Sequence, residues 1–504
     1  MPISAIPQMP GIVRDESPTL AKPRWVDGDG VRFVNGLPEL RGGFESVVLE
    51  AFGGLCRGLH AWQMAGGAWA IAIGTHTHLY VCTGGEIYDI TPTGLAAGLA
   101  DGTGGLGFGT GAFGVGGYGV GSAVDYRPRF WTFGTFGSDL IAAPLNGTIY
   151  RWTGDTASPA APLSGAPARV DTVFVDPVGI VVACGANEQI SGTYNPLLVR
   201  NSDIEAITDW TASLADMAGE FPLRVGSRLV RGLPARGVNL LWTDVALVAM
   251  TFTGDPGSVY RFDVLGQGCG LIGPNAAVVT SSGAYWMGAN GQFYMWTGGA
   301  PQPMACTVRR WVMDNLSYVQ ADKVVAFSNA AHNEVGWIYP DIRDGNECSR
   351  MVLLNTLDGS WSTHTTDRTC RIDAGVLPSP VSATAAGRLY FEERGHSADG
   401  GALSWSLTGS PVEIGAGDTL LEIQEIRPDF QRLIGGADIY LDVRAYPQST
   451  PQAYGPWAAT SATETLYPLV TGRQVAVRLQ GNSAPADMRL GQLLLDVIDT
   501  GDRV

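Results

Sequence analysis

The chain repeats one short stretch almost intact, as NGTIYRWTG at residues 146–154 and as NGQFYMWTG at residues 290–298. Asn-Gly favours a type I′ turn, because this pair supplies the two positive φ angles whose twist suits a β-hairpin. The residues that follow alternate between two faces, so Ile149 and Arg151 point one way while Tyr150 and Trp152 point the other. Each copy therefore predicts a turn followed by an aromatic strand, and a repeated unit of this kind is typical of a repetitive architecture.

Looser relatives of this unit occur elsewhere in the chain. Residues 73–80 lead to the turn Gly84-Gly85 and then to residues 87–92, and residues 386–391 repeat the turn-then-tyrosine core. The units are spread from about residue 70 to 390, as the blades of a β-propeller would be. The 68 glycines and a charged fraction of only 16% also favour a rigid, turn-rich, all-β protein.

Composition and strand pattern suggest three regions. We expect a β-propeller-like domain over residues 51–400, with a glycine-rich loop at 94–121 and an irregular insertion at 155–230. Strands that alternate cleanly after a boundary near residue 400 predict a separate antiparallel β platform domain at 401–504. Residues 1–50 are expected to form an N-terminal β segment that joins this platform.

Helices are expected to be few and short. Residues 203–217 are the best candidate, because Ile204, Ile207, Trp210 and Leu214 recur at three- and four-residue spacing. A second short helix is expected within residues 307–316.

The charge balance limits the partners of the protein. The 32 basic and 48 acidic residues give a formal net charge of −16. Tight binding to DNA requires the opposite sign, because the protein must neutralise phosphates. An acidic surface past which DNA slides without adhering remains compatible with this charge.

The cysteines and the N-terminus indicate the compartment. Seven cysteines without CxxC spacing argue against a disulfide framework and against a zinc site, and they favour buried free thiols in a reducing cytosol. Residues 1–5 carry no signal-peptide pattern, and no apolar run is long enough to span a membrane. We therefore expect synthesis and folding in a cytoplasm.

Candidate chemistry is sparse in the sequence. His76 and His78 could present two imidazoles on one strand face, and Asp27 and Asp29 bracket a glycine as calcium loops do, but neither pair has the further ligands that a metal site needs. The turn at residues 357–361 faintly resembles a sialidase blade turn and occurs once. Hydrolase, metalloprotease and phosphate-binding motifs are missing. The sequence predicts no enzyme, and no catalytic, cofactor-binding or metal-binding residue.

Several short motifs resemble those of structural proteins from short-tailed bacteriophages, in the same order along the chain. They are WVDGDGVRF (25–33), LPELRGGF (37–44), GTHTHLY (74–80), YDITP (88–92), the glycine-rich tract, LNTLDGSWS (354–362), MRLG (488–491) and LDV (495–497).

The resemblance implies a podovirus tail tubular protein B-like tail nozzle or tail hub. Such proteins form a homohexameric ring in the virion tail, below the tail adaptor and the portal. They carry β-propeller domains on the outside, dock tail fibres, and leave a channel through which DNA is ejected without specific binding. No cofactor is implied.

Two alternatives remain open. A host-surface adhesin would need an aromatic shelf for sugars, for which the candidates are Trp62, Trp69, Trp286 and Trp296, although core packing also explains these tryptophans. A glycosidase would need two carboxylates at catalytic separation. A glycan array would distinguish the adhesin from the conduit, and turnover of host polysaccharide would distinguish the glycosidase from both.

Overall fold

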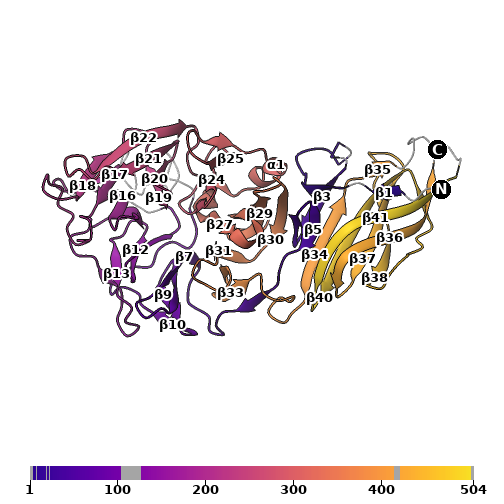
Figure 1. The fold of residues 1–504 in the computed structure, drawn as a ribbon, viewed down its shortest axis with the longest axis horizontal. Coiled ribbons are helices and arrows are strands. Elements are labelled where there is room, and N and C mark those ends of the chain that lie inside the picture. The colour runs from indigo at the N-terminus through magenta and orange to yellow at the C-terminus, as the bar shows by residue number, and fades with distance from the viewer. Residues whose placement is uncertain are drawn as a thin grey trace, which may run out of the picture.

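The computed structural model describes residues 4–6, 8–18, 20–21, 23–103, 126–413 and 420–500, which form an almost purely β fold (Figure 1). The expectation of an all-β protein is therefore confirmed. The described strands build seven four-stranded sheets, one six-stranded sheet and one seven-stranded sheet. The two larger sheets lie together at the end of the molecule where both termini are marked (Figure 1).

The first four of the four-stranded sheets follow one another along the chain as antiparallel meanders. They contain β7 (Cys56–Gln63), β8 (Trp69–Thr75), β9 (Leu79–Thr83) and β10 (Glu86–Asp89); β11 (Trp131–Phe136), β12 (Asp139–Pro144), β13 (Tyr150–Trp152) and β14 (Ala161–Pro162); β15 (Val170–Val175), β16 (Val181–Asn187), β17 (Tyr194–Asn201) and β18 (Gly219–Pro222); and β19 (Leu229–Ala235), β20 (Val238–Thr243), β21 (Ala246–Phe252) and β22 (Tyr260–Gln267).

The remaining three follow the same pattern, except that the last sheet takes its outer strand from the N-terminal region. They contain β23 (Ala277–Thr280), β24 (Gly283–Met287), β25 (Phe293–Trp296) and β26 (Gln302–Pro303); β27 (Val325–Asn329), β28 (Glu334–Pro340), β29 (Cys348–Asn355) and β30 (Trp361–Thr365); and β31 (Arg368–Ile372), β32 (Val381–Thr384), β33 (Leu389–Glu392) and β6 (Phe44–Ser46). The short helical turns α1 (Arg309–Met313), η1 (Tyr318–Lys323) and η2 (Ala330–His332) connect elements of this region.

The first strands of these seven sheets contact one another in a closed cycle: β7, β11, β15, β19, β23, β27, β31 and again β7. We call this part the ring body. The ring arises from packing, since none of the described sheets closes on itself through strand pairing. The cyclic order is what a seven-bladed propeller requires, and the propeller remains our interpretation of it.

Alternating side chains explain why the sheets stack. In β8, Ile71 and Ile73 pack into the cluster shared with the last sheet, while Ala70 and Ala72 pack into the cluster shared with the second sheet. Successive residues of a strand point to opposite faces, so a strand that is apolar on both faces must be covered on both sides. The ring body supplies that cover.

The sequence repeats occupy equivalent places in their sheets. Residues 146–154 and 290–298 each contain the last part of the connection from the second strand to the third and the third strand itself. Residues 73–80 and 386–391 span the same connection in the first and last sheets. The repeat therefore marks one recurring corner of the ring body.

The type I′ prediction for the Asn-Gly turns is wrong. Positive φ occurs at Asn146 (59°) but not at Gly147, and at Gly291 (75°) but not at Asn290. The reason is loop length, because both connections between the flanking strands contain five residues, whereas a type I′ hairpin has a two-residue loop. Gly84-Gly85, with φ of 62° and 86°, forms such a two-residue connection between β9 and β10.

Two further expectations are corrected. Residues 203–217 contain no helix, because Ile204 and Leu214 are exposed and aspartate side chains bond to nearby backbone amides, as Asp203 does to Met217. The segment 155–230, expected to be an irregular insertion, contains the complete third sheet. The short helix expected within residues 307–316 is confirmed as α1. Most of the glycine-rich loop, residues 104–121, lies outside the described residues.

The two larger sheets combine both ends of the chain, and we call them the platform. The six-stranded sheet contains β1 (Ser4–Ile6), β4 (Val31–Val34), β5 (Leu37–Leu40), β36 (Leu421–Ile434), β39 (Val470–Gly472) and β41 (Asp487–Asp499). The seven-stranded sheet contains β2 (Met9–Ile12), β3 (Arg24–Asp29), β34 (Leu403–Gly409), β35 (Val412–Glu413), β37 (Ala437–Arg444), β38 (Gln452–Ala459) and β40 (Gln474–Ser483).

The platform and the ring body share a hydrophobic core. β30 contacts β2, β3 and β4, and one cluster of buried residues joins Trp25 and Leu407 of the platform to Trp337 and Trp361 of the ring body. The strand β6 continues directly from the platform into the last sheet of the ring body. The division into domains stays a prediction, because these contacts couple the two parts closely.

Candidate functional site

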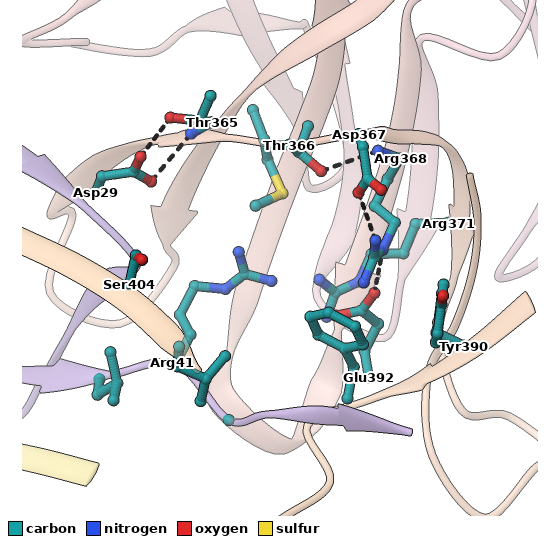
Figure 2. Close-up of a pocket in the computed structure, with 16 residues that line it drawn as sticks. Asp29, Arg41, Thr365, Thr366, Asp367, Arg368, Arg371, Tyr390, Glu392 and Ser404 are labelled. Atoms are coloured by element: carbon teal, nitrogen blue, oxygen red, sulfur yellow. Dashed lines mark hydrogen bonds and ion pairs between the residues drawn. The ribbon is translucent and has the colours of Figure 1, made fainter. Parts of the chain in front are cut away.

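A pocket of about 280 Å³ lies where the platform meets the ring body (Figure 2). Its walls come from β3, from the segment between β5 and β6, from the turn between β30 and β31, and from β33 and β34. Arginine dominates its polar lining through Arg41, Arg368 and Arg371. We call it the junction pocket.

Arg368 is held rigidly on one wall. Its Nε donates to Glu392 at 2.7 Å, and its guanidinium lies over the rings of Phe44 and Tyr390, 4.4 and 4.8 Å from their centroids, while the two rings contact each other edge-on. Phe44 belongs to β6, so this stack fastens the N-terminal strand to the last sheet. Glu392 also accepts a hydrogen bond from the Ser382 hydroxyl.

Glu393 is the centre of a buried ion-pair network beside the pocket. Its carboxylate accepts hydrogen bonds from Arg32, from Arg371 at 3.3 Å and from the backbone amide of Gly42 at 3.1 Å. Arg32 is 1% exposed and also pairs with Glu334 at 3.2 Å. Although burial alone would raise the pKa of Glu393, the surrounding guanidinium groups hold it well below its usual range.

Arg41 differs from its neighbours. No hydrogen bond or ion pair to its guanidinium occurs among the residues that the structure describes, and its buried Nε has no partner. Figure 2 shows it extending into the pocket with no marked contact. Burial, and next the charge of Arg371, lower the pKa of Arg41.

The network predicts acid sensitivity. The pKa values of Glu392 and Glu393 in the folded protein lie below the ordinary value of 4.5. Both carboxylates therefore stabilise the fold above pH 4.5, and this contribution is lost as the pH falls through their folded pKa values. We expect the urea midpoint of unfolding to decrease progressively below about pH 4.5. The substitution E393Q should flatten that decrease, and an unchanged pH profile would contradict the assignment.

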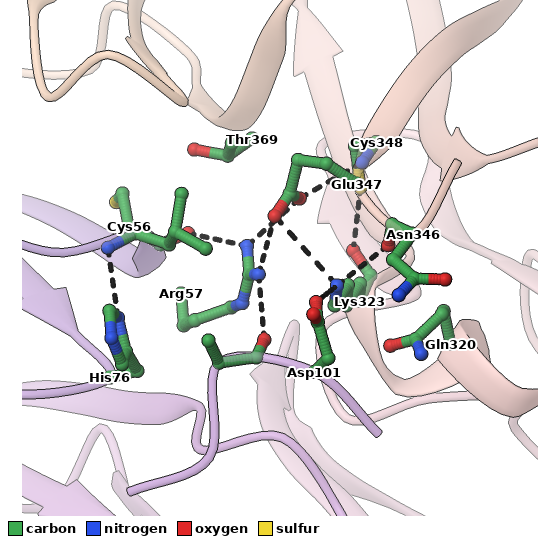
Figure 3. A network of polar contacts seen from close by, with 12 residues as sticks. Cys56, Arg57, His76, Asp101, Gln320, Lys323, Asn346, Glu347, Cys348 and Thr369 are labelled. Atoms are coloured by element: carbon green, nitrogen blue, oxygen red, sulfur yellow. Dashed lines mark hydrogen bonds and ion pairs between the residues drawn. The ribbon is translucent and has the colours of Figure 1, made fainter. Parts of the chain in front are cut away.

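A second network joins the first sheet to the sixth (Figure 3). Arg57, on β7, donates to both oxygens of Glu347, at 3.0 and 2.6 Å. The fully buried Lys323 donates to Asp101 at 2.5 Å and to the carbonyl of Asn346 at 2.6 Å. The hydrogen bond from Lys323 lowers the pKa of Asp101. These contacts cross the ring body and hold it together.

The histidines and aspartates singled out from the sequence do not form a metal site. His76 and His78 lie in the turn between β8 and β9, where His76 Nδ1 accepts a hydrogen bond from the backbone amide of Leu55. Asp27 pairs with Arg14, and Asp29 accepts hydrogen bonds from the amide and hydroxyl of Thr365. In the described part of the chain, no group of three or more His, Cys, Asp or Glu side chains could hold a metal ion.

The four candidate tryptophans do not form a shelf. Trp62 and Trp286 are 3% and 0% exposed and belong to different core clusters. Trp69 and Trp296 are half-buried, on β8 and β25. Residues 357–360 lie in the turn between β29 and β30, and Trp361, the first residue of β30, is buried against Phe293.

Sequence reasoning missed the arginines and glutamates of the junction. The available signal was a charge inside an otherwise apolar strand, such as Arg32 within β4. All seven cysteines are free, and six of them are buried. Across the described ranges, no helix is long and apolar enough to cross a membrane.

No family model matches the chain, and no curated protein matches it.

Proposed function

We propose that the protein is a structural component of the virion tail of a short-tailed bacteriophage. In this role it forms the ring-shaped nozzle or hub that conducts DNA during ejection and docks the tail adaptor and fibres. The proposal rests on the resemblance of the sequence motifs, and the observation that best supports it is the way both chain ends build one platform on a ring body.

The platform suits subunit assembly. β38 is the last strand in its sheet order, and most residues of Gln452–Ala459 are exposed. An outer strand of this kind offers unpaired backbone groups to a neighbour. A head-to-tail contact through such an edge closes into a ring when the rotation allows it, which supports a homohexamer.

The conduit is proposed to lie between subunits. The cavity on the axis of the ring body has a volume of only about 130 Å³. A DNA duplex cannot pass through a space of this size, because its major groove alone is about 12 Å wide. A lumen enclosed by several copies would be lined by an acidic chain of net charge −16. Like charge keeps phosphates from adhering while DNA moves.

Electron microscopy tests the proposal directly. We expect negative-stain images of the purified protein mixed with tail-adaptor complexes to show sixfold rings, with a central hole, at the adaptor end. Cross-linking of the same sample should yield species up to the hexamer. Monomers that remain monomeric with adaptor would contradict the nozzle, and binding to a glycan array would then favour the adhesin.

A further inference from the structure

The axis of the ring body contains a cavity of about 130 Å³. Its lining comes mainly from the first strands of the sheets, β7, β11, β19, β23, β27 and β31. The polar side chains in that lining are His60, Arg231, Asn275, Cys370 and Arg371. No carboxylate is among the described residues that line it.

Arg231 is the unusual group in this cavity. It follows the buried Leu229 and Val230 on β19 and remains partly exposed where it borders the cavity. Among the described residues its guanidinium makes no hydrogen bond or ion pair, and its Nη1 is buried without a partner. Burial lowers the pKa of Arg231 to about 10, so the side chain is still positively charged at neutral pH.

The neighbouring groups do not neutralise this charge. Burial, and next the charge of Arg231, lower the pKa of His60 to about 4, so its imidazole is neutral, and its Nε2 lies 2.8 Å from the Thr135 hydroxyl. Arg371 adds a second guanidinium, which is 2% exposed. An Nη atom of Arg371 donates a hydrogen bond to Glu393, which does not line the cavity, whereas the Nε of Arg371 has no partner among the described residues.

A guanidinium at a narrow cavity without a counterion is unfavourable, because the part that is buried, including Nη1 of Arg231, loses its hydration and no carboxylate of the described lining replaces the water. We propose that the cavity binds a small oxyanion, a phosphate ion or a carboxylate, at the guanidinium of Arg231. The planar fork of arginine matches the paired oxygens of both groups. One water needs about 10–15 Å³ on this measure, so the volume accommodates a tetrahedral oxyanion with a few waters. The site is independent of the proposed tail function.

Calorimetric titration of the full chain with inorganic phosphate tests the site, at pH 7.5 and constant ionic strength in chloride. We expect saturable binding at one site in the wild type and at least a tenfold loss of affinity in R231M. The matched control is R261M, because Arg261 lies on β22 of the same sheet, is 71% exposed and already pairs with Asp263. R231K keeps the positive charge but lacks the planar guanidinium, so it should bind phosphate with intermediate affinity. It also provides a second test of the site if R231M does not fold.

Thermal unfolding in phosphate and in chloride distinguishes binding at this site from a general effect of salt on stability. Phosphate stabilises many proteins by exclusion from their surface, so a site-specific rise in Tm must saturate and must be absent from R231M alone. In chloride, R231M should melt no lower than the wild type, because it removes an unpaired charge. Equal heats in the wild type and R231M, or an equal rise in Tm in every variant, would overturn the proposal.

The self-association of the protein, measured by sedimentation, distinguishes the two sources of the oxyanion, a free ion and a carboxylate of a second copy. If a free ion is the ligand, self-association in chloride will not change on adding phosphate. If a carboxylate of a second copy enters the cavity, phosphate and R231M will both weaken self-association, and R261M will not.

Discussion

Replacing Glu393 by glutamine should destabilise the protein more than any other single change at the junction. The carboxylate compensates two buried guanidinium groups, on Arg32 and Arg371, which are 1% and 2% exposed. Arg32 would keep Glu334 as a partner, but Arg371 would lose its carboxylate, and removing one partner of a buried ion pair typically costs about 3–5 kcal/mol because a buried charge is left without compensation. We expect a large decrease in the urea midpoint, measured by tryptophan fluorescence.

The matched control for this change is E45Q. Glu45 is 55% exposed and lies 3.6 Å from Arg394, and an exposed pair of this kind contributes little. Its midpoint should equal that of the wild type. A midpoint for E393Q that matches the E45Q midpoint would show that the Glu393 network is not a major source of stability.

Replacing Gly43 by alanine should have the second large effect. A Cβ at this position would lie 2.3 Å from the Ser397 carbonyl oxygen and 2.7 Å from the Ser397 amide nitrogen, and both are backbone atoms. The chain that enters β6 would have to move away from the segment that follows β33, and this movement would strain the hydrogen bond from the Gly43 amide to the Gly395 carbonyl, which is 3.0 Å long. We expect a loss of about 3 kcal/mol, at the upper end of the range for overpacked sites.

Calorimetric scans compare the Tm of G43A with that of the control variant G66A. Gly66 has no atom within 4 Å of a Cβ position and no positive φ, so G66A should melt as the wild type does. A normal Tm for G43A would mean that β6 tolerates displacement and does not hold the last sheet.

Local patterns predicted much of the ring body. The turn-then-strand repeat at residues 146–154 and 290–298 correctly indicated equivalent strands, because the alternation of Ile149 and Trp152 between two core clusters is encoded within a few residues. The apparent helix at 203–217 failed for the opposite reason. Periodic spacing predicts a helix only when the apolar residues find a common surface, and Leu214 is 84% exposed.

The junction and the axial cavity could not be predicted in this way. Arg32 and Glu393 are 361 positions apart, and no spacing rule relates residues at that distance. The surroundings of Arg231 depend on which side chains line the cavity, and these come from strands that meet only in the folded ring. Such sites are defined by long-range packing, so the sequence carries only the weak signal of a charge within an apolar strand.

The position of β6 in the last sheet has a consequence for synthesis on the ribosome. The partner strand, β33, emerges roughly 350 residues after β6, which at about 5–20 residues per second means a delay of roughly 20–70 s. Throughout that interval β3 and β5 also lack their later platform partners, β34 and β41, although β3 can pair with β2 and β5 with β4. The nascent chain therefore presents β6 and the outer edges of the β2–β3 and β4–β5 pairs without their late partners for most of its translation, and its yield in a cell will depend on what shields these strands until the last strands arrive.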